Sequence, residues 1–132
     1  MNSTTKLAAA TWAGADAVAG VESRGFILAA ALAERRGKGF VPIRKKGKLP
    51  PPVVDIEYEL EYGSGVLEMQ RGSGRLLLVD DVLATGGTLR ASSALSARAG
   101  YRVSGVGVLI DLGFVPGFAC DGHVVRSAIA YG

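Results

Sequence analysis

The stretch from residue 76 to residue 90 contains the residue types that would bind a phosphorylated sugar. Its first four residues, Leu76 to Val79, form a short apolar run typical of a buried strand. Two adjacent carboxylates, Asp80 and Asp81, follow where that strand should end. Because carboxylates accept hydrogen bonds from hydroxyl groups, this pair could hold the vicinal hydroxyls of a ribose.

A loop rich in glycine and hydroxyl groups follows the two aspartates and precedes a helix-compatible segment; it consists of Ala84, Thr85, Gly86, Gly87 and Thr88. Backbone N–H groups at the N-terminus of a helix bind anions. The glycines allow close approach of the backbone, and the threonines add hydroxyl donors. A phosphate bound here, with a diol on the carboxylates, describes a ribose 5-phosphate site. The simpler alternative is that the aspartates only cap the following helix.

The composition fits a single α/β domain spanning residues 1–132, because this length is common for one domain and 48% of the residues are hydrophobic. The net charge of +3 is unevenly distributed, since seven of the fifteen basic residues lie between Glu34 and Lys48. Such a cluster could bind nucleic acid, an anionic membrane or a polyphosphate. Few aromatic residues lie among these charges, which weakens the case for nucleic acid.

Cysteine usage and hydropathy favour a cytoplasmic protein. Cys120 is the only cysteine, which excludes an intramolecular disulfide and agrees with a reducing compartment. No apolar run approaches the length of a membrane span, and the apolar stretch near the N-terminus is too short for a signal peptide. We therefore expect neither a membrane nor a nucleic acid as partner.

Strand-like and helix-like segments alternate along the chain. This alternation predicts a mostly parallel sheet flanked by helices, with ligands at the carboxyl ends of the strands. Residues 53–69 alternate in the manner of a two-stranded flap. One helix is apolar nearly all round, so we expect it to be buried. The expected core strands are 18–21, 40–43, 76–79, 103–110 and 123–130, and the expected helices are 4–13, 26–36 (the apolar one) and 89–99.

Two further motifs follow predicted strands and should therefore reach the same edge of the sheet. Ser23 and Arg24 lie in a turn of small residues that could hold a pyrophosphate. Arg44, Lys45 and Lys48 belong to a basic run that could neutralise phosphate charge. The alternatives are that the first motif only flanks the start of a helix and that the basic run is a solvated surface turn.

Three motifs together resemble one branch of a known family. Residues 76–90 resemble the phosphoribosyl pyrophosphate (PRPP) signature of type I phosphoribosyltransferases. The basic segment from Pro42 to Pro50 and the segment Tyr58-Glu59-Leu60-Glu61-Tyr62-Gly63 resemble motifs of its adenine branch. The resemblance covers most of the chain and implies the type I phosphoribosyltransferase fold, an α/β fold whose mostly parallel central sheet is flanked by helices and carries a flexible catalytic loop.

The resemblance also implies an activity, in which the 5-phosphoribosyl group of PRPP passes to adenine and gives AMP and pyrophosphate, a step of purine salvage. It assigns the ribose hydroxyls to Asp80 and Asp81 and the 5-phosphate to residues 84–88. Magnesium would arrive bound mainly to PRPP, with at most a contact to one of the two aspartates, and the chain would form a homodimer. The residues assigned to pyrophosphate are Ser23, Arg24, Arg44, Lys45 and Lys48, and the loop that holds the first two often contains a non-proline cis peptide in this family.

Glu61 and Tyr62 are the residues to which the resemblance assigns catalysis. Displacement of pyrophosphate by a purine needs a proton acceptor near the imidazole ring of the base and a lid that excludes water. Glu61 would be the general acid/base and Tyr62 the aromatic lid. Without the surrounding motif, a solvated glutamate between the apolar residues of a strand would be the simpler explanation.

The sequence departs from the family at its N-terminal end. Members of the adenine branch begin with a hood segment that recognises adenine, and nothing similar precedes Leu7. We therefore expect this chain to keep PRPP binding and to recognise adenine less well. A PRPP-binding regulatory or vestigial module is the alternative to an enzyme, and a nucleic-acid-binding domain would rest on the basic run alone.

Overall fold

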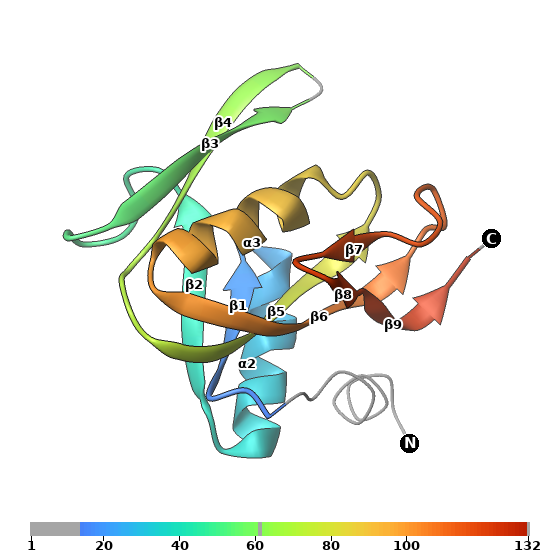
Figure 1. The fold of residues 1–132 in the computed structure, drawn as a ribbon, viewed down its shortest axis with the longest axis horizontal. Helices are drawn as coiled ribbons and strands as arrows, with labels where there is room; N and C mark the ends of the chain where they lie inside the picture. The colour runs from blue at the N-terminus through green and yellow to red at the C-terminus, as the bar shows by residue number, and fades with distance from the viewer. Residues whose placement is uncertain (1–13, 61, 132) are drawn as a thin grey trace.

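A computed structural model describes residues 14–60 and 62–131 of the chain (Figure 1). Two helices and nine strands are defined within these ranges. In chain order they are β1 (Ala17–Val21), α2 (Arg24–Arg36), β2 (Gly39–Lys45), β3 (Val54–Leu60), β4 (Gly63–Met69), β5 (Gly74–Leu83), α3 (Gly87–Arg98), β6 (Tyr101–Asp111), β7 (Ala119–Cys120), β8 (His123–Val124) and β9 (Arg126–Ala130).

One seven-stranded sheet, in the order β3-β4-β2-β1-β5-β6-β9, forms the centre of the molecule. Its part from β2 to β9 is parallel, because β1 pairs in parallel with β2 and β5, and β6 pairs in parallel with β5 and β9. The hairpin β3–β4 joins β2 through antiparallel pairing and extends away from the body of the sheet in Figure 1. The predicted parallel sheet and two-stranded flap are both confirmed.

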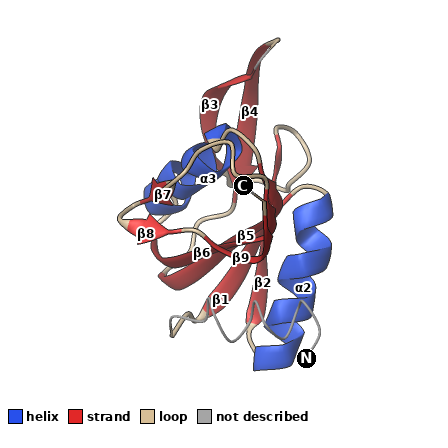
Figure 2. Cartoon of the chain, turned by 90° about the vertical axis from the view of Figure 1, so that its right-hand side faces the viewer, coloured by secondary structure: helices blue, strands red, loops and turns tan. Residues whose placement is uncertain are grey.

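The inner strands are apolar on both faces because a helix covers each face. All four residues from Leu76 to Val79 are fully buried. Leu76 and Leu78 pack in the core cluster on the α3 side, whereas Leu77 and Val79 pack in the cluster on the α2 side. Figure 2 shows α2 and α3 on opposite sides of the sheet. Burial on both faces explains why β5 is a continuous apolar run rather than an alternating one.

Two expectations about these elements are wrong in detail. Helix α2 buries one face only, and its Ile27 is 76% exposed, because the sheet covers a single side of the helix. The strand expected at 123–130 is divided into β8, which pairs with β7, and β9, which pairs with β6. The helix expected at 4–13 lies outside the described residues. Within the described ranges, neither helix is long and apolar enough to cross a membrane.

Candidate active site

Three neighbouring parallel strands bring the predicted site motifs to one edge of the sheet. In the sheet register, Val21 at the end of β1 lies beside Ile43 of β2, and Gly20 lies beside Val79 of β5. The turn after β1, the basic segment after Ile43 and the acidic pair after Val79 therefore start at the same level. The motifs converge toward the carboxyl ends of the strands, as their positions in the sequence predicted. The expected strand end at Val79 is wrong, because β5 continues through Asp80 and Asp81 to Leu83 and stays paired with β6.

The loop from Ala84 to Thr88 lines a small pocket of about 90 Å³ between the end of β5 and the start of α3. A single water needs only about 10–15 Å³, so the pocket has room for an anion of several atoms. Helix α3 begins here with Gly86 as its cap, and this residue offers no side chain to the N–H groups of the first turn. These N–H groups are therefore available to a phosphate.

Gly86 is required at its position for two independent reasons. Its φ of +90° lies in the region that favours glycine, and a Cβ there would lie 2.0 Å from Cε2 of Phe118. Phe118 is buried, and the guanidinium of Arg90 lies 4.6 Å from the centre of its ring. Phe118 therefore packs directly against the phosphate-binding loop and fixes its path. Sequence reasoning identified the glycine but not the aromatic residue behind it.

Asp80 and Asp81 have different surroundings although they are adjacent. Oδ1 of Asp80 accepts a hydrogen bond from the backbone N–H of Asp81 over 2.8 Å, whereas Oδ2 of Asp81 lies 2.9 Å from Nε of Arg24. Burial raises the pKa of Asp80 to about 7, and the charge of Asp81 adds to this effect while that of Arg24 opposes it. Gly25 contributes to the burial, since a Cβ on it would lie only 3.0 Å from Oδ1 of Asp80. A carboxyl group with such a pKa can exchange a proton near neutral pH.

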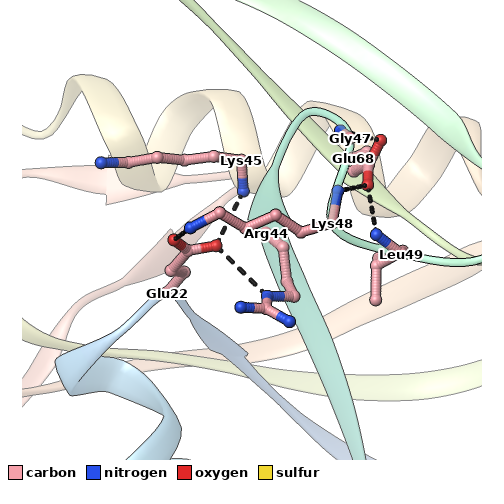
Figure 3. Close-up of polar contacts among 7 residues, drawn as sticks. All are labelled: Glu22, Arg44, Lys45, Gly47, Lys48, Leu49 and Glu68. Atoms are coloured by element: carbon pink, nitrogen blue, oxygen red, sulfur yellow. Dashed lines mark hydrogen bonds and ion pairs between the residues drawn. The ribbon is translucent and has the colours of Figure 1, made fainter.

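Glu22, in the turn after β1, accepts hydrogen bonds from three residues of the basic segment (Figure 3). Oε1 accepts hydrogen bonds from the backbone N–H of Lys45 at 3.0 Å and from Nε of Arg44 at 3.3 Å, and Oε2 accepts one from Nζ of Lys48 at 2.5 Å. Burial by itself would raise the pKa of Glu22, but these hydrogen bonds and the charge of Lys48 lower it to about 2. A resident carboxylate thus lies among the cations that were predicted to bind pyrophosphate. The Glu22–Ser23 peptide bond is cis, as the family resemblance implied.

The remaining groups predicted to bind pyrophosphate differ in how they are held. The guanidinium of Arg44 lies 5.7 Å from the ring centre of Phe26, so this side chain is fixed between an aromatic ring and Glu22. Lys45 is bound through its backbone, and Figure 3 shows its side chain pointing away from Glu22. Ser23 is exposed at the N-cap of α2, where its side chain makes no capping hydrogen bond. Lys45 and Ser23 therefore present side chains to solvent at this edge.

Glu68, on β4, is a polar residue of this region that sequence reasoning missed. It is 3% exposed and accepts hydrogen bonds from the backbone N–H groups of Gly47 at 3.1 Å, Lys48 at 3.0 Å and Leu49 at 2.7 Å. Burial opposes its ionisation, but these three donors hold its pKa below the usual value. The sequence signal was an acidic residue between two apolar core residues of the same strand.

Of the predicted catalytic pair, only Tyr62 belongs to the described residues, and it does not lie over the strand ends. Glu61 lies outside the described residues. Tyr62 is 94% exposed at the tip of the hairpin β3–β4, which Figure 1 shows extending away from the sheet. The function of Tyr62 as a lid therefore stays a prediction, and it requires movement of this hairpin toward the acidic pair.

A magnesium ion would find part of a coordination shell in this chain. No group of three or more His, Cys, Asp or Glu side chains within residues 14–60 and 62–131 could hold a metal by itself. Asp80 and Asp81 offer carboxylate oxygens, and Mg²⁺ in proteins is commonly bound by one or two carboxylates together with water and substrate phosphates. The residues present therefore fit a Mg²⁺ ion that arrives with a phosphorylated substrate.

Comparisons with known proteins agree with this geometry. The phosphoribosyl transferase domain family matches residues 5–113. The adenine phosphoribosyltransferase of Hydrogenovibrio crunogenus is 49% identical over 121 residues, which cover 91% of this chain and 70% of the relative. That of Bdellovibrio bacteriovorus is 51% identical over 116 residues, with 88% and 70% covered. The crystal structure of adenine phosphoribosyltransferase from Thermoanaerobacter pseudethanolicus has a TM-score of 0.85 and 41% identity, over 98% of this chain and 78% of that chain.

Proposed function

Because this chain belongs to the phosphoribosyltransferase family, we propose that it transfers the 5-phosphoribosyl group of PRPP to adenine, forming AMP and pyrophosphate in purine salvage. The convergence of an acidic pair, a phosphate-sized loop pocket and a basic cluster at one sheet edge carries the proposal. A substrate with a diol, a 5-phosphate and a pyrophosphate uses all three features. The choice of adenine is supported by similarity to three adenine phosphoribosyltransferases.

The chain's own groups divide the binding of PRPP among them. Asp80 and Asp81 accept hydrogen bonds from the ribose hydroxyls, and the loop from Ala84 to Thr88 donates backbone N–H groups to the 5-phosphate. The basic cluster neutralises charge that builds up on the pyrophosphate as the bond between its oxygen and C1′ of the ribose breaks. Holding both ends of the substrate orients C1′ toward the incoming base, which converts the reaction into an intramolecular-like step.

The base supplies the new bond to C1′ through its N9 atom, and the proton on N9 must leave as this bond forms. Glu61 is the proposed acceptor of that proton. Tyr62 is the proposed lid, which excludes water from the positively charged sugar as the hairpin β3–β4 closes. Exclusion of water matters because the same sugar centre would otherwise be hydrolysed.

We extend the proposal to the magnesium ion, the homodimer and a cytoplasmic location. Magnesium, bound to the pyrophosphate of PRPP, would supply positive charge that Asp80 or Asp81 could help to place. Self-association is supported by a mostly apolar pocket on α2, lined by Ile27, Leu28 and Ala31 beside Arg24 and Asp81. Cys120 is the only cysteine of the sequence and is buried, and a chain without an intramolecular disulfide is consistent with a cytoplasmic location.

The test of the activity is AMP formation from radiolabelled adenine by the purified chain with PRPP and MgCl₂. We expect AMP and pyrophosphate to form in equal amounts, and we expect much slower reaction with hypoxanthine or guanine in place of adenine. Reactions without PRPP or with EDTA are the controls.

Binding of PRPP is measured in parallel by calorimetry, so that two kinds of failure can be told apart. PRPP binding without AMP formation would indicate that the chain is a PRPP-binding module and not the proposed enzyme. Absence of both would overturn the assignment of the strand-end site itself.

A further inference from the structure

We propose that Glu68 is a positioning residue for pyrophosphate binding: it fixes the backbone of residues 47–49 and thereby places Lys48 at the strand-end site. The inference rests on the proposed use of PRPP by this same site. Glu68 lies on β4 of the antiparallel hairpin β3–β4, outside the edge formed by the carboxyl ends of the parallel strands, so we do not place it against a reacting group. Its effect must therefore pass through the basic segment.

Both carboxylate oxygens of Glu68 are hydrogen-bonded to this segment. Its two oxygens accept three consecutive backbone N–H groups, from Gly47 to Oε1 and from Lys48 and Leu49 to Oε2. A buried charge is tolerated only when it is well hydrogen-bonded. The three donors of one loop satisfy Glu68, so the loop conformation and the ionised carboxylate depend on each other.

Lys48 is the residue through which this contact reaches the site. Its backbone N–H donates to Oε2 of Glu68 over 3.0 Å, and its Nζ binds Glu22 (Figure 3). Glu22 lies in the turn after β1, directly before Ser23 and the first residue of α2, Arg24. Both ends of Lys48 are thus held by contacts within the chain. A second contact, from the backbone N–H of Lys46 to the carbonyl of Val66 on β4, attaches the same loop to the same strand.

The arrangement predicts that Glu68 lowers the entropic cost of bringing Lys48 to a phosphate oxygen. An exposed lysine on an unattached loop must order its backbone when it binds, whereas this backbone is already ordered. Loss of Glu68 should therefore act on binding of the pyrophosphate group. It should leave the pocket at Ala84–Thr88 unchanged, because that pocket is built from β5 and α3.

The first test compares Glu68→Gln with the wild type by calorimetry with magnesium–PRPP and magnesium pyrophosphate. A glutamine amide presents one N–H₂ donor where an acceptor is needed, so at least one backbone donor loses its partner. We expect roughly tenfold weaker binding of both probes, the size of about one charge-assisted hydrogen bond. Glu57→Gln is the matched control, because Glu57 is exposed on β3 of the same hairpin and the charge change is the same.

A double-mutant cycle separates positioning from general stabilisation. In a Lys48→Met background, Glu68→Gln should have little further effect on pyrophosphate binding, because Lys48 is the group that Glu68 places. Fully additive losses would contradict the inference. Unchanged binding in folded Glu68→Gln would contradict it as well, whereas absence of PRPP binding by the wild type would instead overturn the proposed function.

Gly47→Ala tests the same contact without touching the buried residue and decides the question if Glu68→Gln does not fold. Gly47 has a φ of +90° and open space around its Cβ position, so alanine would disturb the loop conformation alone. Gly122→Ala is the control, because Gly122 has a φ of +79°, also has open space around its Cβ position, and is distant from Gly47 in the sequence. Alanine should therefore cause a similar backbone strain there. We expect weaker pyrophosphate binding for Gly47→Ala only; equal binding by the two variants would overturn the inference.

Discussion

Arg24 and Asp81 form an ion pair in which Nε lies 2.9 Å from Oδ2. The family resemblance assigns the first residue to pyrophosphate and the second to the ribose, so two parts of the proposed site contact each other directly. The Arg24 side chain is 80% exposed, and exposed pairs typically contribute no more than about 1 kcal/mol. A highly charged ligand can therefore exchange this contact for its own at little cost. The pair also matters for Asp80, whose pKa is raised mainly by burial: the charge of Asp81 raises it further, and the charge of Arg24 opposes the rise.

We predict that binding of magnesium–PRPP releases a proton from Asp80 at pH 6–7. The raised pKa of about 7 means that much of Asp80 is neutral in this range, while a ligand that donates hydroxyl groups or brings Mg²⁺ favours the ionised form. Calorimetry in buffers of different ionisation enthalpy measures the proton released. With Asp80→Asn, fewer protons should be released on binding, because only the protons that titrate on PRPP itself remain. Equal proton release by the variant and the wild type would show that the proton does not come from Asp80.

The raised pKa of Asp80 should also make the stability of the protein depend on pH. The folded pKa of about 7 lies above the unfolded value near 3.8, so the folded state binds more protons between these values. The contribution of Asp80 to the free energy of unfolding should therefore fall as the pH rises from about 4 to about 7 and then stay constant. Urea unfolding of Asp80→Asn should lack this part of the pH dependence.

Replacing both carboxyl groups, as Asp80→Asn with Asp81→Asn, should weaken magnesium–PRPP binding strongly. Hydrogen bonds to a charged group contribute about 1.5–3 kcal/mol each, so a loss of a hundredfold or more is expected. Calorimetry measures it, and Asp55→Asn, at an exposed position on β3, is the control for the loss of one charge. Unchanged affinity in the double variant would show that Asp80 and Asp81 do not bind the ribose hydroxyls.

The fold and the local motifs were predictable because their signals are contiguous in the sequence. The run Leu76–Val79 is buried on both faces of a sheet, and such a strand is apolar at every position. The pocket formed by residues 84–88 depends on neighbours in the chain, so its glycines and hydroxyls were visible together. The one-sided burial of α2 was not visible, because alanine-rich sequence is compatible with both an exposed and a buried face.

The contacts between motifs were not predictable, since each joins residues that are far apart in sequence. Glu68 binds backbone groups 19 to 21 residues away, and those donors have no side-chain signature. The pKa of Asp80 depends on burial under the first turn of α2, where Gly25 allows close approach. The exposed position of Tyr62 depends on the path of a hairpin, which alternating residues do not specify.

Gly86→Ala should destabilise the protein and disrupt the phosphate-binding loop. The new methyl group would lie 2.0 Å from Cε2 of Phe118, and the φ of +90° is unfavourable for alanine. Overpacking alone costs about 1–3 kcal/mol, so we expect a loss of at least that size in the free energy of unfolding by urea. For stability, Gly87→Ala is the matched control, because its Cβ position is open. Equal stability of the two variants would show that packing of Phe118 against Gly86 does not constrain this loop.

Glu22→Gln should destabilise the turn after β1 in a way that depends on pH. The folded pKa of about 2 lies below the usual 4.5, so the charged contacts of Glu22 stabilise the protein above pH 4.5 and are lost as the pH falls toward 2. We expect the variant to be less stable by about 1 kcal/mol near pH 7, with the difference shrinking at acidic pH. Thermal unfolding at several pH values measures this, with Glu57→Gln as the exposed control. A difference that stays constant down to pH 3 would mean that packing, not charge, is the cause.

Glu61→Gln tests the proposed transfer of the N9 proton. A glutamine keeps the size of the side chain but cannot accept a proton, so turnover of adenine should fall by roughly 10²–10⁴-fold. Magnesium–PRPP affinity should stay within about twofold of the wild type, because Glu61 is proposed to act on the base. Single-turnover measurements of AMP formation separate the chemical step from product release. Glu59→Gln, an exposed glutamate on β3 of the same hairpin, should keep the wild-type rate. A wild-type single-turnover rate for Glu61→Gln would make Glu61 an ordinary surface residue of the flap, and the proton would then need another acceptor.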